Sequence, residues 1–77
     1  MTDSEYLVFR ELPTPGKTKV ISVDSKRSGG RLGTIKWYGA WRQYTFQPWA
    51  GTIWNTGCLQ DVNAYIEELM VDRRRRG

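Results

Sequence analysis

The four tryptophans of this chain all lie between residues 32 and 55, in the stretch LGTIKWYGAWRQYTFQPWAGTIWN. The chain has 77 residues and one cysteine, so it forms at most one domain and cannot close an intramolecular disulfide. A domain this small without a covalent staple needs a dense core. Because aromatic side chains bury large areas, we expect this stretch to supply much of that core. What the stretch leaves open is which of its rings face outward.

Gly39 and Ala40 separate two runs of alternating residues, as in a two-residue hairpin loop with glycine first. Such a loop predicts these opposed pairs: Tyr38 and Trp41, Trp37 and Arg42, Lys36 and Gln43, Ile35 and Tyr44, Thr34 and Thr45. Side chains alternate between the two faces of a strand pair. One predicted face carries Ile35, Trp37, Tyr44 and Phe46, with Arg42 near its end. The other carries Thr34, Lys36, Tyr38, Trp41, Gln43 and Thr45. The first is expected to be the core face, and the second a polar face with an aromatic pair at the turn.

Further strands are predicted around the hairpin. Residues 19–23 (KVISV) are rich in β-branched side chains and alternate, which predicts a strand. Residues 6–11 (YLVFRE) form a short apolar run whose status as a strand is left open, and residues 52–54 (TIW) are long enough for a further short strand. The segments LPTPGK and DSKRSGGR contain proline or glycine and are predicted to be turns.

The residues after Gly57 have helical spacing. Apolar residues at intervals of three and four make one stripe, which consists of Leu59, Val62, Ile66 and Leu69. Thr56 is the predicted N-cap, and Asp61 lies early enough to favour the helix dipole. We expect the stripe to pack on the core face of the hairpin.

The predicted fold class is therefore α+β, a small twisted antiparallel sheet of three to four strands packed against one C-terminal helix. Residues 1–72 are expected to form a single domain, and residues 73–77 (RRRRG) a basic, disordered tail. No apolar run approaches the ~20 residues that span a bilayer. The N-terminus lacks the order of a signal peptide, and a lone thiol fits a reducing compartment. The expected location is the cytoplasm.

No catalytic constellation can be assembled from these residues. The chain has no histidine for acid–base work or for the usual zinc sites, and its serines have no base beside them. Cys58 has no histidine partner and is interpreted as a small, half-buried residue. The segment SGGRLG lacks the Lys-Ser/Thr ending of a phosphate loop. We expect no enzyme, no cofactor and no metal.

The net charge of +4 is unevenly distributed. Residues 17–45 contain seven basic side chains and one acidic side chain, residues 56–69 contain three acidic and no basic ones, and the tail adds four arginines. Such asymmetry favours a polyanionic partner, and DNA is the first hypothesis. The candidate binding residues are Lys36, Tyr38, Trp41, Gln43 and Thr45 on the polar face, Arg27 and Arg31 in the preceding loop, and Arg73, Arg74, Arg75 and Arg76 in the tail. The alternative is a solvated face on which Tyr38 and Trp41 merely shield the turn.

The second hypothesis is that the chain binds a host protein and inhibits or redirects it. Exposed Trp, Tyr and Arg dominate interface hot spots. Such a patch would consist of Tyr38, Trp41, Arg42, Trp49 and Trp54. Trp49 and Trp54 are also interpretable as a cover for the end of the core. The expected state is a monomer or a weak homodimer formed through an open sheet edge, with no membrane partner. Steep salt dependence would indicate DNA.

Residues 32–69 resemble a segment found in small proteins encoded by bacteriophages and prophages. The shared pattern is leucine-glycine, an aromatic strand, Trp-Arg-x-Tyr-x-Phe-x-Pro, a threonine-containing strand, and Cys-Leu-x-Asp before a helix. It falls here on Leu32-Gly33, Trp37-Tyr38, Trp41-Arg42, Tyr44, Phe46, Pro48, Thr52, Cys58-Leu59 and Asp61. The resemblance implies a phage-encoded protein that acts inside a bacterium. A looser resemblance, in element order and hairpin, is to the DNA-binding domains at the N-terminus of tyrosine integrases and in plant AP2 factors.

Overall fold

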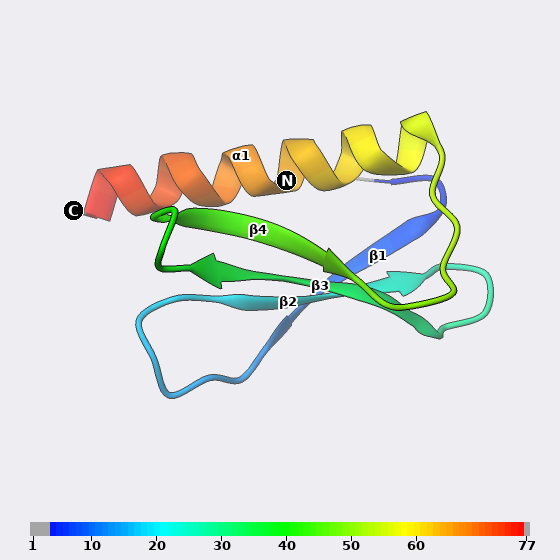
Figure 1. Ribbon diagram of the computed structural model, residues 1–77, viewed down its shortest axis with the longest axis horizontal. Coiled ribbons are helices and arrows are strands. Elements are labelled where there is room, and N and C mark those ends of the chain that lie inside the picture. The colour runs from blue at the N-terminus through cyan, green and yellow to red at the C-terminus, as the bar shows by residue number, and fades with distance from the viewer. Residues whose placement is uncertain (1–3, 77) are drawn as a thin grey trace.

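The computed structural model describes residues 4–76 and contains four β-strands followed by one α-helix (Figure 1). The strands are β1 (Leu7–Leu12), β2 (Val20–Ser25), β3 (Arg31–Tyr38) and β4 (Gln43–Pro48), and the helix is α1 (Thr56–Arg76). Each strand pairs antiparallel with the next, in the order β1-β2-β3-β4. The helix lies across one face of the twisted sheet, which confirms the α+β fold class.

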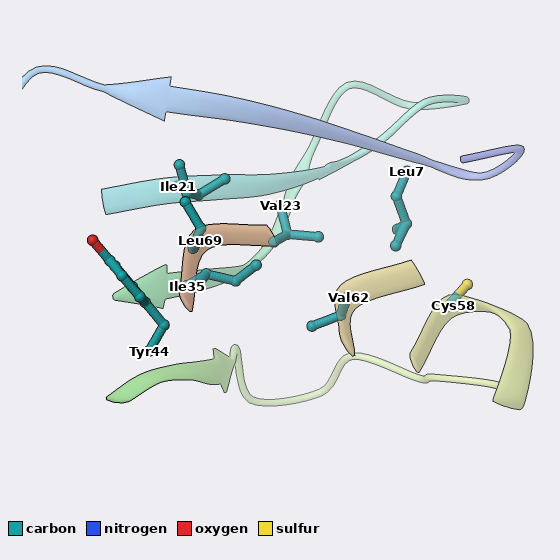
Figure 2. Close-up of a cluster of buried hydrophobic side chains, with 8 residues drawn as sticks. All are labelled: Leu7, Ile21, Val23, Ile35, Tyr44, Cys58, Val62 and Leu69. Carbon is teal, nitrogen blue, oxygen red and sulfur yellow. The ribbon is translucent and has the colours of Figure 1, made fainter. Parts of the chain in front are cut away.

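The core lies between α1 and the face of the sheet that it covers, which we call the inner face. Ile21, Val23 and Ile35 have no exposed surface, and they belong to the cluster of buried side chains shown in Figure 2. The other buried members of that cluster are Leu7, Tyr44, Cys58, Val62 and Leu69. Full burial of one aliphatic side chain contributes about 1.5–3 kcal/mol, so these few contacts supply much of the stability of so small a domain.

The two short candidate strands, residues 6–11 and 52–54, differ in outcome. Residues 7–12 form β1, an edge strand paired with β2. Residues 52–54, expected as a further short strand, are not a strand. Gly51 has a positive φ of 80°, and Thr52 turns back so that its Oγ1 donates to the carbonyl oxygen of Trp49 at 2.6 Å. The chain is therefore bent on itself here and offers no straight edge for pairing.

The hairpin of β3 and β4 confirms the predicted faces but corrects the predicted register. Its loop has four residues, 39–42, and Tyr38 pairs with Gln43 where Trp41 was expected. The prediction of a two-residue loop was wrong because Gly39 does not take the positive φ that such a loop requires, whereas Arg42 does, at 53°. The register moves by two residues, so every side chain that remains in β3 or β4 stays on its predicted face, while Trp41 and Arg42 lie in the loop.

The N-cap of the helix lies one residue earlier than predicted. Asn55, not Thr56, is the N-cap, because its Oδ1 accepts the backbone N–H of Cys58 at 2.8 Å. The core stripe is also rotated. Cys58 is buried while Leu59 is 47% exposed, since neighbouring helical residues point about 100° apart. Asp61 lies beyond the first helical turn, where its Oδ2 accepts a hydrogen bond from the hydroxyl of Ser4 at 2.7 Å and ties Ser4 to the helix.

The helix also runs further than expected, through Arg76. The predicted disordered tail is wrong for residues 73–76, and residue 77 lies outside the described residues. Arginine is a good helix former, and cations near a helix C-terminus are favoured by the helix dipole. The guanidinium of Arg73 lies 4.0 Å from the centre of the Trp37 ring, which fastens this last part of the helix to the sheet.

Candidate nucleic-acid interface

The helix leaves the opposite face of the sheet uncovered, and we call it the outer face (Figure 1). Its members follow from the strand register, because they alternate with the buried residues of the inner face. They are Val8, Arg10, Leu12, Val20, Ser22, Asp24, Thr34, Lys36, Tyr38, Gln43, Thr45 and Gln47. Asp24 is the one carboxylate among these strand residues. Whether it is exposed or buried and paired therefore decides the charge of the whole face.

Asp24 is only 6% exposed and is held by a polar network on β1, β2 and β3. Its Oδ2 lies 3.2 Å from the guanidinium of Arg10, and its Oδ1 accepts the hydroxyl of Ser22. The Oγ of Ser22 in turn accepts the Nε–H of Arg31 at 2.8 Å. Because buried charges must be paired and hydrogen-bonded, this network explains how β2 is buried on both faces. The accessible charge of the outer face is therefore positive.

Five of the predicted binding residues come together on this face at the turn between β3 and β4, and we call them the hairpin patch. They are Lys36, Tyr38, Trp41, Gln43 and Thr45. The ring of Tyr38 meets the ring of Trp41 edge to face, with centroids 5.0 Å apart, and the two rings are 44% and 66% exposed. The predicted aromatic pair is present, although the loop and not the strands brings its members together.

Arg31 lies at the far end of the same face, where Trp49 joins it. The guanidinium of Arg31 is 5.8 Å from the centre of the Trp49 ring, which is 51% exposed. The backbone N–H of Trp49 donates to the carbonyl of Leu32 at 2.9 Å, so the backbone of Trp49 is hydrogen-bonded to β3. Arg27 is exposed in the loop between β2 and β3. We call Arg31 and Trp49 the loop-end pair.

The arginines of the helix end are not part of this face. Arg73 packs on Trp37, which points to the inner side with Tyr44. Arg74 and Arg75 are exposed on the same last part of α1, and the side chain of Arg76 lies outside the described residues. Arg73 also borders a half-open cavity of about 550 Å³, lined by Gly16, Lys17, Lys19, Tyr44, Leu69 and Asp72. The predicted binding residues thus separate into two groups on the outer face and one group beyond it.

Two residues of the outer face, Arg10 and Trp49, were not assigned to it from the sequence. Arg10 was overlooked because residues 6–11 were not firmly assigned to a strand, yet alternation with Leu7 and Phe9 places it outward. Trp49 was left undecided between core and surface. The signal that separates it from Trp54 is structural, because the Trp54 ring packs edge-on against Phe46 and its Nε1 donates to Thr52.

Cys58 is buried in the core beside Leu7 and Val62, so its thiol is not presented at the surface. Within residues 4–76, no three side chains of the histidine, cysteine, aspartate or glutamate type gather to hold a metal ion. Over the same residues, α1 is not apolar enough to span a bilayer.

Two comparisons with known proteins found nothing and one found a relative. No family model matches the chain, and no solved structure matches it, so the likeness to integrase and AP2 domains stays a prediction. The chain is 38% identical over 73 residues to a protein described as "Uncharacterized 9.3 kDa protein" of Acholeplasma phage L2. That match covers 94% of this chain and 94% of the relative. The chain therefore belongs to the same family of small phage proteins as this 9.3 kDa protein of Acholeplasma phage L2.

Proposed function

We propose that this protein binds nucleic acid, DNA in the first instance, through the outer face of its sheet. The observation that carries the proposal is the burial of Asp24 between Arg10 and the Ser22–Arg31 pair. It removes the one strand carboxylate of the face from solvent, while Lys36 and the two guanidiniums stay on it. Cations of this kind neutralise phosphates, and threonine, glutamine and tyrosine side chains donate hydrogen bonds to them.

The opposite side of the molecule supports this orientation. Between Thr56 and Asp72 the helix carries Asp61, Glu67, Glu68 and Asp72 and no basic residue. A nucleic acid approaching the helix before its last turn would meet like charge, whereas one approaching the outer face would not. The phage family supports a place of action inside a bacterial cell, where DNA is accessible to such a protein.

The test is a titration of labelled DNA, followed by fluorescence anisotropy at low and at physiological salt. Lys36→Gln should weaken binding and flatten the salt dependence, by about 0.7–0.9 in the slope of log K against log salt for each phosphate contact removed. Lys17→Gln is the matched control, because it removes the same charge from an exposed residue beyond the outer face. Equal losses from both variants would show that only net charge matters and would refute the assignment to this face.

A second candidate function is binding to a host protein. It is favoured by Ile53, which is 95% exposed, and by Leu59, which is 47% exposed near the start of the acidic helix. Large apolar side chains left in solvent beside a charged helix face are typical of a protein interface. Such an interface should lose little affinity with added salt, and Ile53→Ala should weaken it without affecting DNA.

A further inference from the structure

The outer face carries exposed aromatic rings at both of its ends. At one end are Tyr38, the last residue of β3, and Trp41 in the loop after it. At the other is the loop-end pair, with Arg31 the first residue of β3 and Trp49 directly after β4. Tyr38 lies seven residue steps along β3 from Arg31, which corresponds to about 23 Å at ~3.3 Å per residue. Between the two ends, the outward-facing side chains of β3 and β4 are Thr34, Lys36, Thr45 and Gln47.

From this arrangement we propose that the outer face binds single-stranded nucleic acid, with unpaired bases stacked at the two aromatic ends and the backbone lying along β3 and β4. The inference rests on the proposed function and names the form of nucleic acid that the face accepts. Aromatic rings stack on the bases of a single strand, whereas the bases of a duplex are already stacked on each other. Trp41 at 66% exposure and Trp49 at 51% exposure leave ring surface for such contacts.

The number of cations agrees with a single strand. The outer face has three of them, Arg10, Arg31 and Lys36, and the first two also stabilise the buried Asp24. A duplex binder that neutralises about 6–10 phosphates needs more cations than this face provides. A strand held mainly by stacking needs fewer cations, and the charge of the face is complementary to its phosphates.

The loop-end pair combines the two kinds of contact in one place. The Nε–H of Arg31 donates to Ser22, which fixes the side chain, and the exposed guanidinium lies beside the Trp49 ring. One nucleotide there would place a phosphate against the guanidinium and a base against the indole. The span between the two ends accommodates roughly four to seven nucleotides, fewer if extended and more if stacked at ~3.4 Å.

The test measures affinity for labelled oligothymidylates of increasing length, for oligouridylates of the same lengths, and for a duplex of matched length. We expect single strands to bind at least tenfold more tightly than duplex, and affinity to rise with length until both aromatic ends are reached. The DNA and RNA arms show which sugar is accepted, and preference for either strand over duplex supports the proposal. Quenching of tryptophan fluorescence reports stacking directly.

The variants separate stacking from simple apolar contact. Trp49→Leu should lower affinity for the longer strands about tenfold, while Trp49→Phe keeps a ring and should retain most of it. Because Trp49 is half-exposed, neither substitution should disturb the fold. An unchanged unfolding midpoint confirms that each variant folds. Duplex bound as tightly as single strand, or equal affinities of the two Trp49 variants, would overturn the single-strand proposal and leave the proposed function standing. Failure to bind any nucleic acid would overturn both.

Discussion

The two faces of the sheet are both buried along β2, but by opposite means. On the inner face, Ile21 and Val23 are covered by the helix and by apolar neighbours. On the outer face, which the helix does not cover, Asp24 pairs with Arg10 and Ser22 accepts a hydrogen bond from Arg31. The first arrangement stabilises the fold through apolar area, and the second through paired charges. The difference shows how a single strand can support a core on one side and a positively charged surface on the other.

The inner face should be the sensitive one. Trp37 packs edge to face on Tyr44 and beneath Arg73, so Trp37→Ala removes contacts to both the core and the helix end. We expect a loss of about 3–5 kcal/mol, which is most of the stability of a small domain. Urea unfolding followed by circular dichroism measures it, with Lys36→Ala on the outer face as the control that should change little. A cooperative, fully folded Trp37→Ala protein would show that the faces are misassigned.

The polar network of the outer face comes next in magnitude. Asp24→Asn removes the charge but keeps the shape, which leaves Arg10 without its carboxylate partner beside the Ser22–Arg31 hydrogen bond. We expect a loss of about 2 kcal/mol in the free energy of unfolding. Glu11→Gln is the control, because that carboxylate is 57% exposed and pairs with Lys19 at 3.8 Å, where ion pairs contribute ~0–1 kcal/mol. If both substitutions cost the same, burial of Asp24 does not matter.

Gly33 tests how tightly the inner face is packed at the end of β4. A Cβ at this position would lie 2.7 Å from the Phe46 ring and 3.0 Å from the backbone oxygen of Gln47. The ring itself is held by Trp54, so Gly33→Ala should cost about 1–3 kcal/mol. Gly30→Ala is the matched control, since its nearest neighbour is the Ser28 hydroxyl at 3.5 Å. Equal thermal midpoints for the two variants would contradict this close packing.

The smallest expected effect is a dependence on pH at the inner edge of the sheet. Burial against Phe9 raises the pKa of Tyr65 above its ordinary value of 10.0, and the nearby carboxylates of Glu11 and Glu68 add to the rise. The folded protein then holds this proton more tightly than the unfolded chain. The stability contributed by Tyr65 is complete below pH 10 and falls as the pH rises through the folded-state pKa. Relative to Tyr65→Phe, the wild-type protein should therefore lose stability above pH 10, and parallel curves would argue against a raised pKa.

The faces could be predicted from sequence, but the loop and the network could not. Strand alternation depends only on parity, so an error of two residues in the hairpin register left Ile35, Trp37, Tyr44 and Phe46 on the correct side. Loop length depended on which residue takes a positive φ. Arg42 does so, whereas the predicted two-residue loop required it of Gly39. The Asp24 network joins three strands, and one of them was not firmly assigned. At the helix, Asn55 and Thr56 are both competent caps, and composition does not choose between them.

The most direct test of the outer face is a map of amide chemical shifts in ¹⁵N-labelled protein as an oligonucleotide is added. We predict that the largest shifts fall on β3 and β4, at Lys36, Tyr38, Gln43 and Thr45, and in the segment around Trp49. The amide signals of residues 59–72 of the helix should not change. Shifts confined to residues 73–75, or concentrated on the acidic helix, would contradict it and would assign binding to the arginines or to a different face.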